Sequence, residues 1–377
     1  MAKLFVCGDI VNQTPNYDFV SKDLARIISN ADFSVCNFEG PELAKGQQAT
    51  FPHQESGTAS YLKSIGFNLM LLANNHITEQ GADGIKRTIA TIKTVGCDCI
   101  GAGLSWEEAY QPIEKIIAHQ RLGFINVCEA QVGQYISKEQ PYGYAWMGYE
   151  NLLDDVSKLR ERNNHVIVFV HAGLEHYDVP LPEIRELYRK ICDSGATAVI
   201  GGHPHCAQGW EKYKDSLIVY SLGNFFFPLR ERWSQESHSY SIELECGENG
   251  NIDITPIFHH NTGNCVELDD NATCVNIKKL NSKLEDNYSA LVKGVIQDSY
   301  NNLCKRLLIQ ATCGQNEKDG WKTIVRKVLN YTIYRSKNVL FTKQKRDSLL
   351  LRLFENETYR WIIIRYLKNR SDYDKEN

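Results

Sequence analysis

Side chains that can bind a metal ion or move a proton follow most of the apolar runs in the first 260 residues. One run, NLMLLA (68–73), ends at Asn74-Asn75-His76, and another, HVIVFV (165–170), ends at His171. Ligand sites gather beyond the carboxyl ends of parallel strands, so residues at such ends are expected to share one site. Further runs end in the same way, at Asp9, Asn37, Glu39, His203, His205 and Asn224.

This set of oxygen and imidazole ligands contains no thiolate. It suits Mn²⁺, Fe²⁺, Zn²⁺ or Mg²⁺ better than Cu(I) or an iron–sulfur cluster. The ligands are numerous enough for two ions bridged by a carboxylate, an arrangement that ionises water and clamps a phosphoryl group. A neighbouring histidine can donate a proton to the leaving oxygen. The chemistry indicated is therefore metal-assisted hydrolysis.

Each motif also has a plain structural explanation. Gly8-Asp9 is typical of a turn, and Asn37 or Glu39 could cap a helix. His203-Pro204-His205 is more specific, because the proline is expected to fix a rigid, extended tripeptide. The hypothesis depends on the joint pattern and on no single motif.

Short apolar runs alternate with helical spacing as far as about residue 260, which predicts an α/β core. Helices are expected over 19–29, 84–95 and 181–193. The runs at 241–246 and 252–258 are expected to be antiparallel strands that close a sheet. The other predicted strands are 4–7, 33–36, 68–73, 97–103, 122–128, 165–170, 197–202 and 216–223.

The chain changes character after about residue 270. Apolar residues from Ile277 to Val295 recur every three or four positions, which predicts an amphipathic helix, and helical patterns also cover 321–334 and 346–368. From residue 301 onward there are 17 Lys and Arg against 8 Asp and Glu, whereas the preceding residues hold 25 and 38. This basic tail is either a helical cap on the core or a docking surface for an acidic partner or a membrane face.

Overall composition excludes several classes of protein. The formal net charge of −4 gives no indication of nucleic-acid binding. No apolar stretch is long enough for a transmembrane helix, and the N-terminus reaches Gly8-Asp9 too early for a signal peptide. The 12 cysteines show no zinc-site spacing and are expected to be reduced core residues. We therefore expect a cytoplasmic protein, or one peripheral to the inner membrane surface.

Seven segments together resemble the bacterial capsule-synthesis family called CapA, or poly-γ-glutamate capsule proteins. That family is similar to the calcineurin-like metallophosphoesterases. The resemblance covers roughly residues 1–260, and its most specific segments are YSLGNF and the histidine-proline-histidine segment. The segments are GD (8–9), NFEGP (37–41), ANNHITEQG (73–81), GAG (101–103), HAGLEH (171–176), GGHPH (201–205) and YSLGNF (220–225).

The resemblance implies a four-layer αββα sandwich over 1–262, followed by a basic helical extension over 270–377. It implies one or two divalent ions, Mn²⁺, Fe²⁺ or Zn²⁺. Asp9 and His205 would bind the first ion, and Glu39 would replace the usual bridging aspartate. The second ion would be bound by Asn75, His171 and His203.

The resemblance also assigns catalytic and substrate-contacting positions. His76 would protonate the leaving group, and Glu175 is placed with it as a catalytic residue. Phosphoesterases have a histidine two residues after the first aspartate, whereas this chain has Val11 at that position. The CapA-like proteins also lack that histidine. Contacts to the substrate are expected from Asn74, Glu79, His176 and Asn224.

The sequence therefore predicts a metal-dependent, phosphoesterase-like hydrolase in the biosynthesis of a bacterial capsule or surface polymer. Two alternatives stay open. One is a non-catalytic accessory or binding subunit of a synthase for poly-γ-glutamate or a polysaccharide, joined to it through the basic helical tail. The other is an amide hydrolase or transferase that acts on poly-γ-glutamate.

Overall fold

The computed structural model describes residues 1–131, 135–137, 140–228, 238–285, 287–305, 307–308 and 348–376. The chain forms two compact units, Met1–Tyr288 and Ser289–Asn377. Val275 and Leu280 are buried in the hydrophobic core of the first unit. The extension expected over 270–377 thus begins with residues that pack on the first unit, and the division into two domains stays a prediction.

The first unit is built mainly from two β-sheets. Each of the ten predicted strands overlaps a strand of the structure, and the predicted antiparallel pair is confirmed as β14 and β15. The strands are β1 (Ala2–Ile10), β2 (Phe33–Phe38), β3 (Leu69–Leu71), β4 (Asp98–Ile100), β5 (Ala102–Gly103), β6 (Ile113–Ile117), β7 (Gln120–Cys128), β8 (Gly143–Tyr144), β9 (His165–His171), β10 (Ala198–Gly202), β11 (Trp210–Tyr213), β12 (Ser216–Val219), β13 (Asn224–Phe226), β14 (His238–Cys246), β15 (Ile252–Asn261) and β16 (Val266–Leu268).

The two sheets differ in their strand order. The first runs β16-β15-β14-β1-β2-β3-β4, and β13 also pairs with β1. The second runs β11-β12-β10-β9-β7-β6. Strands β1 to β4 are parallel, as are β7, β9, β10 and β12, so each sheet brings several carboxyl ends to one edge.

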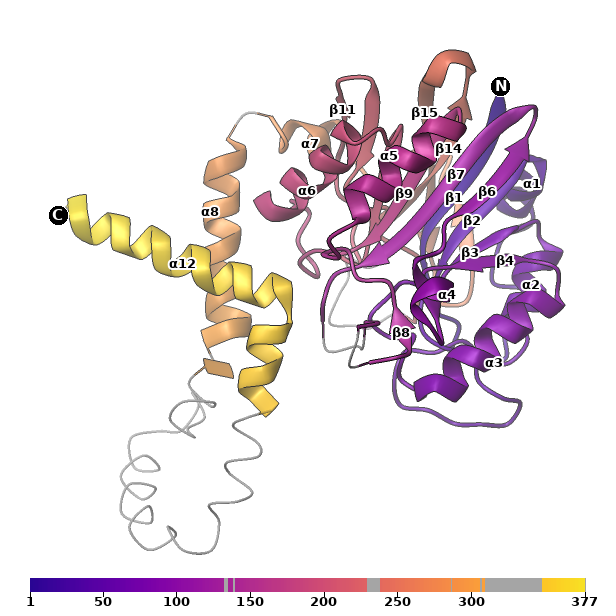
Figure 1. Ribbon diagram of the computed structural model, residues 1–377, viewed down its shortest axis with the longest axis horizontal. Helices are drawn as coiled ribbons and strands as arrows, with labels where there is room; N and C mark the ends of the chain where they lie inside the picture. Colours follow the sequence, from indigo (N-terminus) through magenta and orange to yellow (C-terminus); the bar gives the residue numbers. More distant parts are fainter. Residues whose placement is uncertain are drawn as a thin grey trace, which may run out of the picture. The chain divides into compact units, whose positions relative to one another are not determined.

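Helices cover the outer faces of both sheets (Figure 1). Leu4 and Val35 of the first sheet share one core with Phe124 and Phe169 of the second, so the sheets pack face to face. Helices α1, α2 and α3 pack on the other face of the first sheet, and α5 and α6 pack on the second. These four layers confirm the expected αββα sandwich.

The helices of the first unit begin and end close to the positions that the patterns predict. α1 (Lys22–Asn30), α3 (Gly81–Thr94) and α6 (Pro182–Asp193) confirm the three predicted helices. Sequence patterns missed α5, a polar helix that buries three apolar residues against the second sheet. The other helices are α2 (Thr58–Ser64), α4 (Trp106–Tyr110), α5 (Leu152–Arg162) and α7 (Ile277–Ser282), with a short 3₁₀ turn at Glu248–Gly250.

The prediction of one continuous helix from Ile277 to Val295 is wrong. The structure has two helices, α7 and α8 (Tyr288–Ser299), and Asn287 between them has a left-handed φ of 65°. A π-helical turn, Tyr300–Cys304, follows α8. In the last predicted stretch, residues 348–355 are helical and α12 spans Glu357–Glu376. The helix expected over 321–334 lies outside the described residues.

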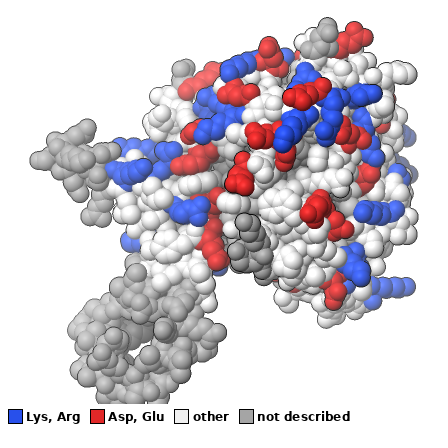
Figure 2. Space-filling model, in the orientation of Figure 1, with Lys and Arg blue, Asp and Glu red and all other residues white. Residues whose placement is uncertain are grey.

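Two further expectations concern the chain as a whole. The 11 cysteines among the described residues are all free thiols, as expected for core cysteines. No helix in the described part of the chain is long and apolar enough to cross a membrane. Figure 2 shows basic and acidic side chains interspersed over the visible face of the first unit.

Candidate metal centre

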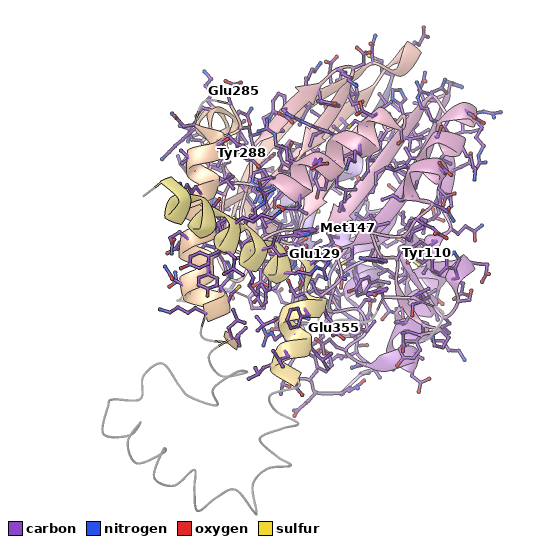
Figure 3. The ribbon with its side chains drawn as sticks, turned by 60° about the vertical axis from the view of Figure 1, so that its left-hand side comes forward. Tyr110, Glu129, Met147, Glu285, Tyr288 and Glu355 are labelled. Atoms are coloured by element: carbon purple, nitrogen blue, oxygen red, sulfur yellow. The ribbon has the colours of Figure 1, made fainter. Side chains whose placement is uncertain are left out.

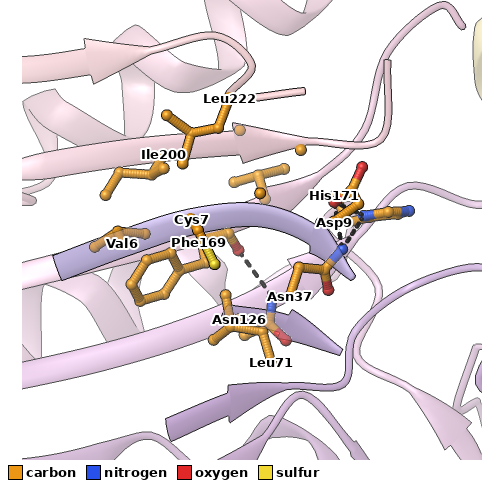
Figure 4. Close-up of a pocket in the computed structure, with 14 residues that line it drawn as sticks. Val6, Cys7, Asp9, Asn37, Leu71, Asn126, Phe169, His171, Ile200 and Leu222 are labelled. Carbon is orange, nitrogen blue, oxygen red and sulfur yellow. Dashed lines mark hydrogen bonds and ion pairs between the residues drawn. The ribbon is translucent and has the colours of Figure 1, made fainter. Parts of the chain in front are cut away.

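The carboxyl ends of β1, β2 and β9 meet and bring three polar side chains together (Figure 4). The amide Nδ2 of Asn37 donates a hydrogen bond of 2.6 Å to Asp9 Oδ1, and it lies 2.9 Å from His171 Nδ1. His171 Nδ1 and Asp9 Oδ1 are 3.8 Å apart. Asp9 is fully buried and His171 is almost fully buried. Residues that are 162 positions apart in sequence therefore contact one another because their strands end at the same edge.

Close backbone packing gives Asp9 its position. The Asp9 N–H donates to the carbonyl oxygen of Gly223, and the register between β1 and β2 shifts at Asp9. A Cβ at Gly8 would lie only 1.8 Å from the Gly223 oxygen, so no larger residue fits there. The Gly-Asp motif is thus a close approach of two chain segments that aims the carboxylate of Asp9 at the site.

Two further ligand atoms lie close to the second nitrogen of His171. His171 Nε2 is 3.1 Å from Asn75 Oδ1 and 3.1 Å from His203 Nδ1. Donors bound to one ion at about 2.0–2.2 Å lie roughly 3.0–3.5 Å from one another, because they surround the ion. The spacing of Asn75, His171 and His203 therefore fits a bound transition-metal ion.

Glu39 supplies a second test of whether a cation fits. Its side chain is fully buried, and neither carboxylate oxygen has a hydrogen-bond partner among the described residues. The imidazole of His76 lies nearby, with its Nε2 3.8 Å from Glu39 Oε1. One donor atom each from Asp9, Glu39 and His171 lies within 4.8 Å of the others. A buried carboxylate without partners costs free energy, and a metal ion would remove that cost.

The loop after β10 contributes two more histidines. The backbone N–H of His203 donates to Asp9 Oδ2 at 3.1 Å. His205 Nδ1 lies 2.9 Å from Asn224 Oδ1 and 3.6 Å from Asp9 Oδ2. Asn224 stands beside Asp9 because β13 pairs with β1 in parallel. Asp9, His205 and Asn224 therefore meet at the position expected for the first ion.

The expectation that His203-Pro204-His205 is extended is wrong. The φ angles of His203 and His205 are 92° and 56°, in the left-handed region that non-glycine residues rarely adopt. This bend turns both imidazoles toward the site, with ring centroids 5.6 Å apart. Such strain is concentrated at functional sites, where surrounding contacts hold it.

Burial and neighbouring charges set the protonation states in the cluster. Burial lowers the pKa of His171 and of His203 well below the usual range, so both imidazoles are neutral ligands. Burial raises the pKa of Asp9 and raises that of Glu39 to about 7. Burial would lower the pKa of His205, but Glu39 and Asp9 outweigh it and raise that pKa to about 9. The site thus already holds positive charge on His205 beside its carboxyls.

The two residues proposed to be catalytic lie at the open side of the cluster. His76 Nδ1 is 3.0 Å from Glu79 Oε1, and its other nitrogen faces Glu39. Glu175 is 47% exposed, and its carboxylate lies 3.9 Å from His203 Nε2. Glu175, His203 and His205 form a second group whose donor atoms lie within 4.8 Å of one another.

Two predicted substrate contacts differ in their surroundings. His176 is partly exposed, and its ring centroid lies 6.0 Å from that of His205. Asn74 is fully buried, and its amide bonds to backbone groups of Phe38, Gly40 and His76. In this structure Asn74 joins two loops and does not line the surface of the site.

Sequence reasoning missed Gln131 and Glu129. The Gln131 amide donates to Glu129 and accepts from Asn75 Nδ2 at 3.1 Å, and its nitrogen lies 2.6 Å from His203 Nε2. Gln131 thus contacts both Asn75 and His203, the two residues whose other atoms face His171 Nε2. Glu129 directly follows the apolar run 122–128, so the strand-end signal could have found it. Gln131 lies beyond the strand end and carries no such signal.

A small pocket lies beneath the cluster (Figure 4). Its walls are largely apolar residues of the two sheets, such as Val6, Leu71 and Phe169. Asp9, Asn37 and His171 line the end of this pocket. The apolar walls keep this side of the cluster at low dielectric. Electrostatic interactions between the charged side chains of the cluster and a bound ion are stronger in such surroundings than in water.

Comparisons with known proteins identify proteins that are similar to this chain. The capsule biosynthesis protein CapA of Bacillus anthracis is 30% identical over 263 residues, which cover 66% of this chain and 63% of that protein. The PGA biosynthesis protein CapA of Bacillus subtilis (strain 168) is 25% identical over 262 residues, or 66% and 67% of the two chains. The crystal structure of a phosphatase from Mycoplasma pneumoniae superposes with a TM-score of 0.45 at 15% identity, covering 74% of this chain and 98% of that one.

The chain thus spans about two thirds of the length of these CapA relatives. Residues 3–229 match the family of the bacterial capsule synthesis protein PGA_cap. This region contains the two sheets up to β13 and every residue of the candidate metal centre. The chain belongs to the PGA_cap family of bacterial capsule synthesis proteins.

Proposed function

We propose that the chain is a metal-dependent, phosphoesterase-like hydrolase that acts in the biosynthesis of a bacterial capsule or another surface polymer. The supporting observation is the fully buried carboxylate of Glu39, which has no hydrogen-bond partner among the described residues and has donor atoms of Asp9 and His171 within 4.8 Å. A structural role alone does not explain a buried carboxylate left without hydrogen bonds.

One or two divalent ions, Mn²⁺, Fe²⁺ or Zn²⁺, would be held by this cluster and would supply Lewis acidity toward a phosphoryl oxygen. Asp9 and His205 belong to one half of the site, and Asn75, His171 and His203 to the other. Glu39 would connect the two halves of the site. Only imidazole, amide and carboxylate donors contribute, which favours these ions over soft ones.

His76 is the proposed general acid. Glu79 accepts at Nδ1 and orients the ring, so the other nitrogen points toward Glu39 and the centre of the site. In that orientation the protonated imidazole can donate to the oxygen of a leaving alcohol. The side chain of His76 is 23% exposed, so a leaving group can reach it from solvent.

The test is turnover of bis(4-nitrophenyl) phosphate by the purified chain with Mn²⁺. Wild-type protein is expected to hydrolyse it, and His76→Ala is expected to lower kcat by about 100-fold or more. His260→Ala is the control, because His260 lies on β15 and pairs with Glu267. Equal rates for wild type and His76→Ala would contradict the proposed acid.

A non-catalytic accessory role is the second candidate, and Val11 is the observation that favours it. Val11 stands two residues after Asp9, is fully buried, and offers no ligand atom. The first half of the site therefore has fewer donors than the second. Two results together would support this role. The metal-loaded protein would be inert toward phosphate esters and poly-γ-glutamate, and it would co-purify with a membrane synthase through residues 270–377.

A further inference from the structure

Glu175 reaches the candidate metal centre from an exposed loop. This loop, residues 173–181, connects β9 to α6. Because Glu175 is 47% exposed, packing around its side chain does not determine where the carboxylate lies. Its distance of 3.9 Å from His203 Nε2 depends on how the backbone of the loop is held.

The inner side of the loop is held by the segment that carries His203 and His205. The His176 N–H donates to the carbonyl oxygen of Pro204 at 2.8 Å. Gln208 Nε2 donates to the carbonyl oxygen of Tyr177 at 2.7 Å. The two segments that supply Glu175, His203 and His205 are thus joined by one backbone hydrogen bond and one side-chain hydrogen bond to a backbone carbonyl.

The outer side of the loop is held from a distant part of the chain. Lys283 Nζ forms an ion pair of 2.5 Å with Asp178 Oδ2. Tyr288, labelled at the beginning of α8 in Figure 3, donates its hydroxyl to the carbonyl oxygen of Pro180 at 2.9 Å. The guanidinium of Arg185 lies 4.6 Å from the centroid of the Tyr288 ring.

The segment that supplies Lys283 and Tyr288 is itself anchored on the first unit. The backbone N–H of Trp210 donates to Asn281 Oδ1 at 2.9 Å, and Leu280 and Leu284 are buried. A Cβ at Gly209 would lie 2.8 Å from the Leu280 oxygen, which shows how closely α7 approaches the segment after His205. Residues 276–285, 287 and 288 therefore form a fixed support for the loop.

We propose that Lys283 and Tyr288 are positioning residues that hold loop 173–181 so that Glu175 joins His203 and His205 in binding a divalent cation. This inference rests on the proposed function. Both residues lie outside the matched family region, 3–229, so the C-terminal extension completes a site whose other residues the family region provides. The side chain of Lys283 is only 22% exposed, so its ion pair with Asp178 is less screened than a surface pair.

The test uses the full chain with Lys283→Met, Tyr288→Phe and the double substitution. Amide hydrogen exchange is measured for 173–181 in metal-free protein, and Mn²⁺ affinity is measured by calorimetry. The double variant is expected to exchange about tenfold faster in this loop and to bind Mn²⁺ about tenfold more weakly. Lys283→Arg alone is expected to keep the exchange rate and the Mn²⁺ affinity of wild type. The charge exchange Asp178→Lys with Lys283→Asp is expected to do the same, because both variants keep an ion pair at this position.

Lys279→Met is the matched control, because Lys279 lies on the same helix and makes no ion pair among the described residues. Unchanged exchange in the double variant would overturn the inference, as would faster exchange with unchanged Mn²⁺ affinity. Wild-type protein that binds no Mn²⁺ would contradict the proposed metal site. The exchange measurement on metal-free protein would still decide whether Lys283 and Tyr288 hold the loop.

Discussion

His171 and His203 face each other across the site with Nε2 and Nδ1 3.1 Å apart. His171 ends β9, and His203 lies in the loop after β10. β9 and β10 are adjacent parallel strands of the second sheet. Their ring centroids are 4.7 Å apart and the rings are inclined by 58°, so the nitrogens meet edge to edge and are not hidden by stacking. Since burial keeps both pKa values well below the usual range, two neutral imidazoles share this space.

Removing one of these imidazoles is expected to abolish tight metal binding. His203→Ala deletes a donor atom and leaves Asn75 and His171 as the remaining ligands around that position. We expect Mn²⁺ affinity, measured by calorimetry on chelator-treated protein, to fall by at least about 100-fold, more than the loss of an outer contact costs. His260→Ala should bind Mn²⁺ as wild type does, and equal affinities for His203→Ala and wild type would contradict the site.

Gln131 is expected to matter for metal affinity although it is not a proposed ligand. Gln131→Ala removes hydrogen bonds to Asn75 and His203 together, so both ligands gain freedom. Mn²⁺ affinity should fall by about tenfold. Gln111→Ala, at an exposed position after α4, is the control. An unchanged affinity in the Gln131 variant would show that the ligands are held by other contacts.

Gly202 lies where the carboxylate of Asp9 leaves no room for a side chain. A Cβ at this position would be 2.9 Å from Asp9 Oδ1. Gly202→Ala is expected to displace Asp9 and to destabilise the fold by about 1–3 kcal/mol, because the buried site cannot expand freely. Urea unfolding measures the stability, and Mn²⁺ calorimetry measures the effect on the site.

Gly294→Ala is the contrasting substitution for this experiment. Gly294 lies in α8, and a Cβ there meets no atom within 4 Å. It should stabilise that helix by about 0.5–1 kcal/mol, since alanine loses less backbone entropy than glycine. A Gly202→Ala variant as stable as wild type, with unchanged Mn²⁺ binding, would show that Asp9 tolerates the crowding.

His259 is expected to make the fold sensitive to acid. It is fully buried next to the hydroxyls of Ser239 and Ser241, and burial lowers its pKa to about 3. As the pH falls below 6.5, the unfolded chain takes up a proton at His259 that the folded chain accepts only near pH 3. Stability is therefore highest above pH 6.5 and decreases toward pH 3, by about 4 kcal/mol from this residue.

The measurement is urea unfolding as a function of pH for His259→Gln and for His260→Gln. The pH dependence between 6.5 and 3 should be weaker in the His259 variant than in wild type. The His260 variant should weaken it much less, because burial lowers the pKa of His259 more than the charge of His260 does. A His259 variant with the full wild-type slope would mean that other buried groups account for the acid sensitivity.

The local sequence determined the elements of the α/β core and the residue types at their ends. Apolar runs such as 165–170 are too short and too β-branched to be helices, and polar residues must stand where a buried run ends. Asp9, Glu39, Asn75, His171, His203 and His205 could therefore be named from sequence. Their convergence follows from the rule that the carboxyl ends of parallel strands share one edge.

Tertiary structure alone decided the contacts that no local pattern encodes. The bend at His203 and His205 requires left-handed backbone that only surrounding contacts stabilise, so the sequence suggested an extended segment instead. The support that Lys283 gives to Asp178 joins residues 105 positions apart, and neither residue type is unusual at a helix end or in a loop. Such pairs depend on how the sheets, loops and α7 pack together, because side-chain contacts between distant segments exist only once the chain has folded.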